Sequence, residues 1–311
     1  MEMVIQLALL ALGFVLLVKG ADWFVDGAAS VAAKLGIPQL VIGLTIVAMG
    51  TSAPEAAVSL TAAFHGNADI TIGNVVGSNI MNVLVILGLA AVICPMAVAR
   101  LTVFVDIPVT FAISLLLFVL GFDGSIGRLN AAILLVVFMG YLSYLFLMTK
   151  KGLIEGESEE EGAKIQSVSK ALLFTALGLV LIIVGSSFAV DAASAIAKML
   201  GLSERFIGLT VVALGTSLPE LFTSVAAAMK KNPDMAIGNI VGSNIFNILF
   251  IVGLSGMVIP VPFASAFRFD MMIAAATMLL LFVLCLPKRR LGRIAGVIML
   301  AGYGAYFAMI W

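Results

Sequence analysis

The chain has 311 residues, of which 62% are hydrophobic and only 11% are charged. An ordinary soluble domain has about 25% charged residues, so the composition excludes a water-soluble globular protein and indicates an integral membrane protein. The 17 basic and 17 acidic residues balance, which gives no indication of nucleic acid as a partner.

Apolar runs long enough to cross a roughly 30 Å hydrocarbon core follow one another along the chain. The first begins at Met3 with no basic leader or cleavage site before it, and we expect it to be a retained helix. The runs are separated by breaks at residues 36–39, 65–69, 95–101, 122–128, 150–170, 201–205, 230–234, 262–268 and 287–293. These breaks predict an all-α integral membrane protein with ten transmembrane helices.

The basic residues near alternate breaks predict the orientation of the chain. One side carries Lys34, Arg100, Lys150, Lys151, Lys164, Lys170, Lys230, Lys231, Lys288, Arg289, Arg290 and Arg293. The other side carries only Arg128, Lys198, Arg205 and Arg268. The positive-inside rule places the first set in the cytoplasm and both termini outside it. We expect a multi-pass protein of the plasma membrane, or of the inner membrane in a Gram-negative cell.

An internal repeat divides the chain into two halves. Residues 43–55 read GLTIVAMGTSAPE and residues 208–220 read GLTVVALGTSLPE, with 10 of 13 positions identical at an offset of 165. At the same offset, IGNVVGSNIMN (72–82) matches IGNIVGSNIFN (237–247) at 9 of 11 positions. The repeat predicts five-helix halves at residues 1–149 and 168–311, joined by a short acidic cytoplasmic linker at 150–167. Because five is odd, the second half is expected to be inverted, as in many transporters.

Two acidic residues, Glu55 and Glu220, lie near the middle of predicted spans, where an unpaired charge costs at least about 2.5 kcal/mol. No Lys or Arg lies within these two helices, so we expect both carboxylates to share a cavity with a mobile cation. Pro54 and Pro219 remove backbone donors and free carbonyl groups before each Glu. The neighbouring turns carry the hydroxyl groups of Thr51, Ser52, Ser59, Thr216, Ser217 and Ser224.

The spans that follow add further oxygen ligands. Ser78 and Asn82 share a helix face at a spacing of four, as do Ser243 and Asn247. An all-oxygen set favours Ca²⁺, Mg²⁺ or Na⁺ over zinc or copper, and many flexible ligands favour Ca²⁺ over Mg²⁺. One Ca²⁺ neutralises two carboxylates, and two or three Na⁺ balance or slightly exceed them, so competition for the pair predicts exchange.

The motifs GTSAPE and GTSLPE, each followed by GNVVGSNIMN or GNIVGSNIFN, resemble the alpha repeats of the Na⁺/Ca²⁺ exchanger branch of the Ca²⁺/cation antiporter superfamily. The resemblance covers essentially the whole chain and implies a sodium/calcium exchanger-like fold that works by alternating access. It implies Glu55 and Glu220 as the central ligands. It also implies carbonyl ligands from Thr51, Thr216, Ala48 and Ala213, hydroxyl ligands from Ser52, Ser78, Ser217 and Ser243, and a border formed by Asn82 and Asn247. Some relatives have Asp in place of Asn247, which disfavours K⁺-dependent exchange here.

Other functions stay open at this point. The main alternative is Ca²⁺/H⁺ antiport by the same two glutamates. A cation channel fits the inverted repeat less well, and an intramembrane enzyme is disfavoured because the chain has no GxSxG or HExxH motif. We expect no enzyme activity and no cofactor. The expected partners are the transported ions Ca²⁺ and Na⁺, with H⁺ as the alternative, and the lipid bilayer, and the sequence implies no protein partner.

Charged and thiol groups outside the motifs are expected to have structural roles. Lys19 and Asp22 are predicted to form a local pair, and Asp26 and Asp191 to act in capping or pairing. Cys94 and Cys285 form no CxxC pair and predict neither a disulfide nor a zinc site.

Overall fold

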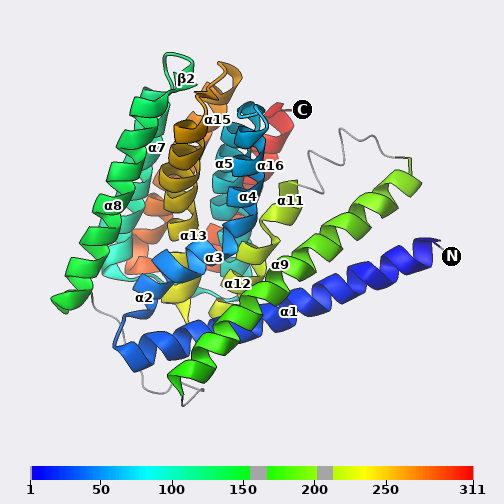
Figure 1. Cartoon of the computed structure of the whole chain (residues 1–311). Coiled ribbons are helices and arrows are strands. Elements are labelled where there is room, and N and C mark those ends of the chain that lie inside the picture. The colour runs from blue at the N-terminus through cyan, green and yellow to red at the C-terminus, as the bar shows by residue number, and fades with distance from the viewer. Residues whose placement is uncertain (1, 155–166, 202–212, 311) are drawn as a thin grey trace.

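The computed structural model describes residues 2–154, 167–201 and 213–310, and these are almost entirely helical (Figure 1). The first half contains α1 (Glu2–Leu35), α2 (Gln39–Ile42), η1 (Gly43–Val47), α3 (Ala48–Thr51), α4 (Ala53–Phe64), α5 (Asp69–Met81), η2 (Asn82–Leu87), α6 (Gly88–Ile93), β1 (Met96–Ala97), η3 (Thr102–Asp106), α7 (Ile107–Leu120), β2 (Ser125–Ile126) and α8 (Arg128–Lys150). The second contains α9 (Val168–Met199), α11 (Ala213–Thr216), α12 (Leu218–Met229), α13 (Pro233–Phe246), η6 (Asn247–Val252), α14 (Gly253–Val258), β3 (Val261–Pro262), α15 (Ala266–Cys285), η7 (Pro287–Arg289), β4 (Arg290–Leu291) and α16 (Arg293–Ile310).

Membrane-spanning helices dominate the described chain. Eight continuous helices are long and apolar enough to cross a membrane, and the pair formed by Gln39–Thr51 and Ala53–Phe64, bent by 49°, makes a ninth candidate. The predicted breaks coincide with the gaps between the observed helices to within a few residues, and the breaks at 150–170 and 201–205 extend outside the described residues. The multi-pass membrane architecture predicted from the composition is therefore confirmed.

A proline follows the helix break that lies beside each glutamate. Pro54 lies at the start of α4 and Pro219 at the start of α12, where a missing backbone N–H does not disturb the helix that follows. The preceding helices end just before them, and Ser52 and Ser217 take non-helical backbone angles between the two segments. Each half therefore carries a break one turn before its glutamate.

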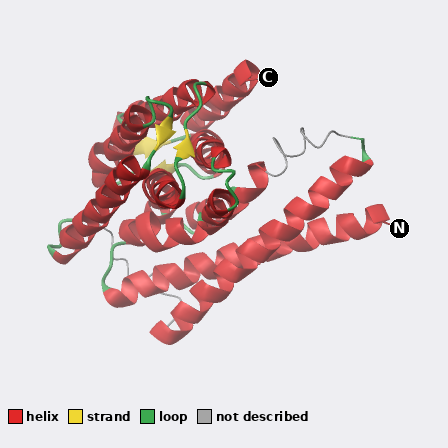
Figure 2. Ribbon diagram, turned by 45° about the horizontal axis from the view of Figure 1, so that its top comes forward, coloured by secondary structure: helices red, strands yellow, loops and turns green. Residues whose placement is uncertain are grey.

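The long helices α1 and α9 cross in an antiparallel pair beside the other helices (Figures 1 and 2). A Cβ added to Gly13 would lie 2.7 Å from the backbone N of Ala189, and one added to Gly20 would lie 2.8 Å from that of Ile182. As the residue number in α1 increases, the number of the residue that it contacts in α9 decreases, so the two helices are antiparallel. Matching glycines thus let two equivalent helices approach backbone to backbone.

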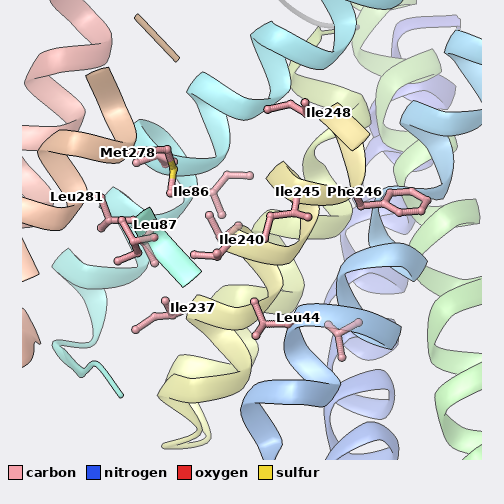
Figure 3. Close-up of a cluster of buried hydrophobic side chains, with 14 of the residues drawn as sticks. Leu44, Ile86, Leu87, Ile237, Ile240, Ile245, Phe246, Ile248, Met278 and Leu281 are labelled. Atoms are coloured by element: carbon pink, nitrogen blue, oxygen red, sulfur yellow. The ribbon is translucent and has the colours of Figure 1, made fainter. Parts of the chain in front are cut away.

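The span Pro233–Val258, which comprises α13, η6 and α14, lies at the centre of the remaining helices, and 94% of its most apolar 18 residues are buried. Its side chains Ile237, Ile240 and Ile245 meet Leu44 of η1 and Met278 of α15 in an apolar cluster (Figure 3). Two short antiparallel ribbons, β1 with β4 and β2 with β3, join loops of one half to loops of the other. Contacts between the halves therefore hold the bundle together.

The glycine contacts between α1 and α9 lead to a stability prediction. We expect Gly13→Ala to lower the thermal unfolding temperature in detergent, because the added methyl group meets backbone atoms and overpacking costs about 1–3 kcal/mol. The matched control is Gly140→Ala in α8, where no other described segment lies within 4 Å of the added Cβ. An equal effect of the two substitutions would contradict the close approach.

Candidate cation site

The two predicted glutamates lie together in the interior. Glu55, near the start of α4, and Glu220, near the start of α12, are each only 1% exposed. The Ser52 hydroxyl donates to Glu220 Oε1 at 2.8 Å, and the Ser217 hydroxyl donates to Glu55 Oε1 at 3.5 Å. Each carboxylate is thus bound by the serine that lies three residues before the other, so the site draws equally on both halves.

These carboxylates have no basic partner in the described part of the chain. Glu55 Oε2 and Glu220 Oε2 are buried and accept no hydrogen bond from any described group. The ion pairs among described residues involve neither glutamate, and no group of three or more His, Cys, Asp and Glu side chains gathers there. Two buried negative groups of this kind require compensation by protons or mobile cations.

Hydroxyl and carbonyl groups predicted from the motifs surround this pair. The Thr51 hydroxyl lies 3.3 Å from the carbonyl oxygen of Ala48, and the Ser243 hydroxyl lies 3.4 Å from the same carbonyl. Ser243 also interacts with the Glu220 carboxylate, as Thr216 does with that of Glu55. The structure thereby brings together residues from α3, α11 and α13 that are far apart in the sequence.

The remaining predicted residues border this centre. Asn82 and Asn247, each 1% exposed, begin the π-helical turns η2 and η6. Ser78 lines a cavity of about 390 Å³ and makes no hydrogen bond to the glutamates within the described chain. Ala213 begins α11, at the limit of the described residues.

Two asparagines that the sequence interpretation did not select hold the glutamate helices in place. Asn239 Nδ2 donates to Ser224 Oγ at 2.9 Å and to the Glu220 carbonyl at 3.5 Å. Asn74 Nδ2 makes the equivalent bonds, to Ser59 Oγ at 2.9 Å and to the Glu55 carbonyl at 3.2 Å. Both asparagines lie in the matched IGNxVGSN motif, so their recurrence at the offset of 165 was the available signal.

One buried carboxylate lies outside this site. Asp106 is 0% exposed, its Oδ2 has no partner among described groups, and its Oδ1 lies 3.5 Å from the Tyr141 hydroxyl. Asp106 lies only four residues after the start of the span Thr102–Leu120, so its position in the sequence did not indicate an acid in the middle of a span.

The surroundings of the site differ between the two halves. A cavity of about 530 Å³ separates α4 from α9 and is lined by Pro54, Ser186, Asp191 and Thr216, among others. The equivalent helices α12 and α1 are in contact, with the rings of Phe14 and Phe222 6.0 Å apart. The site therefore borders a cavity on one side and packed helices on the other.

An ion-pair cluster holds the packed side. Lys230 Nζ, just after α12, lies 2.9 Å from Asp26 Oδ1 and 3.3 Å from Asp22 Oδ1. The predicted pairing of Asp26 is confirmed. The predicted local pair of Lys19 with Asp22 is wrong, because Asp22 pairs with Lys230 at the end of α12, whereas Lys19 is exposed.

The fold and the repeated carboxylate site define a membrane transporter built from two related halves. The sodium/calcium exchanger protein family model matches residues 5–147 and again residues 170–311, so the chain belongs to this family. It is similar to the putative antiporter CaxA of Alkalimonas amylolytica (40% identity over 98% of both chains) and to the sodium/calcium exchanger MaX1 of Methanosarcina acetivorans (33% over 99% of both).

A solved structure gives the same result for the fold. The sodium-calcium exchanger NCX_Mj, soaked with zero Na⁺ and Ca²⁺, superposes with a TM-score of 0.86 at 33% identity and covers 99% of each chain. The family and the exchanger fold inferred from the repeated motifs are therefore confirmed.

Stability measurements can test the roles of the two helix-holding asparagines. Asn239 is fully buried and also accepts a bond from the Thr51 hydroxyl at 3.0 Å, whereas Asn74 is partly buried. We expect Asn239→Ala to lower the unfolding temperature more than Asn74→Ala, because each buried group left unsatisfied costs about 1–3 kcal/mol. Equal shifts in thermal unfolding of the purified variants would refute this difference.

Proposed function

We propose that the protein is a secondary antiporter that exchanges Ca²⁺ for Na⁺ at the site formed by Glu55 and Glu220. The observation that carries this proposal is the pair of buried carboxylates, one from each half, with unpartnered Oε2 atoms and no described basic group in contact. Ligands that are all carboxylate, carbonyl, hydroxyl or amide oxygens favour hard cations. The names of the relatives MaX1 and NCX_Mj agree with these two ions.

We assign the ligand roles from the repeated motifs and from the contacts around the two glutamates. Glu55 and Glu220 supply the central charge of about −2, and Ca²⁺ or two to three Na⁺ compensate it. The carbonyl groups of Ala48, Thr51, Ala213 and Thr216, the hydroxyl groups of Ser52, Ser78, Ser217 and Ser243, and the amide oxygens of Asn82 and Asn247 complete the shell. Because the same negative pair serves both ions, binding of one favours release of the other.

The proposed architecture has ten spans in two inverted halves, 1–149 and 168–311, with the acidic linker 150–167 in the cytoplasm. The antiparallel contact of the equivalent helices α1 and α9 supports the inversion. The charge bias of the loops supports termini outside the cytoplasm, in the plasma membrane or a bacterial inner membrane.

Alternating access is supported by the difference between the two halves. Thr216, which contacts Glu55, lines the 530 Å³ cavity between α4 and α9. On the opposite side Lys230 ties the end of α12 to α1. A site that borders a cavity on one side and a packed, ion-paired contact on the other is the arrangement that alternating access requires in each of its end states.

The direct test is radioactive Ca²⁺ uptake into proteoliposomes that contain the purified protein. An outward-directed Na⁺ gradient should drive uptake, whereas a pH gradient alone should not. Uptake driven only by the pH gradient would establish Ca²⁺/H⁺ antiport instead. Ca²⁺ flux that needs no counter-ion would indicate a channel.

Glu55→Gln and Glu220→Gln should each reduce Na⁺-driven Ca²⁺ uptake at least about 100-fold, because loss of one charge leaves a divalent ion only half compensated. Both variants should remain folded in the membrane, since Gln keeps the shape and the serine contact. The control is Asp123→Asn in an exposed loop, which should transport normally. Full uptake by either Glu variant rules out the assignment.

Lys230→Gln should weaken the contact between α12 and α1. The two ion pairs hold α12 on α1, and their loss should favour the opposite state by about 1 kcal/mol, or roughly fivefold in the ratio of the two states. The measurement is labelling of Val25→Cys, buried in α1, by a membrane-impermeant thiol reagent in a background without Cys94 and Cys285. Lys231→Gln, at the exposed neighbouring lysine, should leave the labelling rate unchanged.

A further inference from the structure

Four buried asparagines meet where α5 and α13 cross. Asn79 and Asn82 come from the first half, and Asn244 and Asn247 occupy the same positions 165 residues later; all four are at most 3% exposed. Asn79 Nδ2 donates to the backbone carbonyl of Asn244 at 3.1 Å, and Asn244 Nδ2 donates to that of Asn79 at 3.3 Å. Two reciprocal hydrogen bonds between side-chain amides and backbone carbonyls therefore join the two helices where they cross.

These bonds fix which end of each amide faces which neighbour. A backbone carbonyl can only accept, so it selects the NH₂ end of Asn79 and Asn244 and leaves each Oδ1 to face the other way. Asn247 Nδ2 donates to Asn79 Oδ1, and Asn82 Nδ2 donates to Asn244 Oδ1, both at 3.0 Å. Turning any of these amides over would set donor against donor or acceptor against acceptor.

The outer members of the network end on unpartnered oxygens. Asn82 Oδ1 and Asn247 Oδ1 are buried and accept no hydrogen bond within the described chain. Asn247 lies one turn after Ser243, which contacts the Glu220 carboxylate and the Ala48 carbonyl. An unsatisfied buried amide oxygen beside this site costs about 1–3 kcal/mol unless a cation or water occupies the space in front of it.

We infer that Asn79 and Asn244 are positioning residues that fix the amides of Asn247 and Asn82, respectively, so that their oxygens and not their NH₂ groups face the transported cation. This inference rests on the proposed function. Each half positions the ligand of the other, because Asn79 acts on Asn247 and Asn244 acts on Asn82. Without Asn79, Asn247 is free to turn, and its NH₂ group would repel the cation that its oxygen attracts.

The test separates positioning from stability by kinetics. Asn79→Leu, nearly equal in shape, should raise the apparent KM of Na⁺-driven Ca²⁺ uptake about tenfold while the maximal rate per folded protein changes little, which corresponds to about 1.4 kcal/mol of ion binding. Asn130→Leu is the matched control, since it removes a side-chain bond to the Leu120 carbonyl at the start of α8, away from the crossing. It should leave KM unchanged.

A double-mutant cycle gives the decisive result. Asn247→Ala alone should raise KM, but added to Asn79→Leu it should have almost no further effect, because the ligand is already misoriented. Asn82→Ala should still add its full effect to Asn79→Leu, since Asn82 is held by Asn244. Additive effects of Asn79 and Asn247, or loss of maximal rate with unchanged KM, would overturn the inference.

The outcomes also distinguish this inference from the proposed function. If the unaltered protein takes up no Ca²⁺ under a Na⁺ gradient, the proposed function fails. If it transports and the cycle shows no coupling between Asn79 and Asn247, only the positioning role fails. Should Asn79→Leu not fold, Asn79→Ser removes the same acceptor with a smaller group and carries the same expectation for KM.

Discussion

The structure depends on two carboxylates kept out of water without a basic partner among the described residues. Burial of an ionised carboxylate costs several kcal/mol of free energy, and the hydrogen bonds from the paired serine hydroxyls offset only part of that cost. Glu55 and Glu220, when both are ionised, therefore require positive charge close to them at the centre of the molecule. A lysine beside them would neutralise their charge permanently and leave no charge for a mobile cation to compensate. Its absence from the described surroundings makes mobile cations the natural source of compensation.

Duplication explains why the contacts come in reciprocal pairs. The serine of each half binds the glutamate of the other, and the inner asparagine of each half binds the outer asparagine of the other. An interaction that evolved once in a pair of identical halves is present twice after duplication and divergence. The candidate cation site consequently lies between the halves, and any relative movement of the halves would change its contacts from both sides.

Most of the spans and the burial of the two glutamates could be predicted from the sequence, because hydropathy and an exact offset of 165 are properties of the chain itself. The contacts between helices could not. Lys230 pairs with Asp22 and Asp26, and Asn239 reaches Thr51, only because of how the helices rotate and cross. Periodicity shows which face of a helix is polar but not which helix that face meets. Asp106 was missed for a related reason, since a position near the end of a span does not reveal complete burial.

The glycines of the repeated motif show how one sequence supports two arrangements. In the second half, a Cβ on Gly242 would lie 2.5 Å from the Leu44 carbonyl oxygen, and this close approach brings Ser243 to the Ala48 carbonyl. In the first half, the equivalent Gly77 has no described atom within 4 Å of its Cβ position and instead lines the 390 Å³ cavity beside Ser78. The same motif thus has different described neighbours in the two halves. Under the inverted halves and alternating access proposed above, exchange of these two sets of contacts between the halves would move the cavity beside Ser78 to the equivalent position beside Ser243.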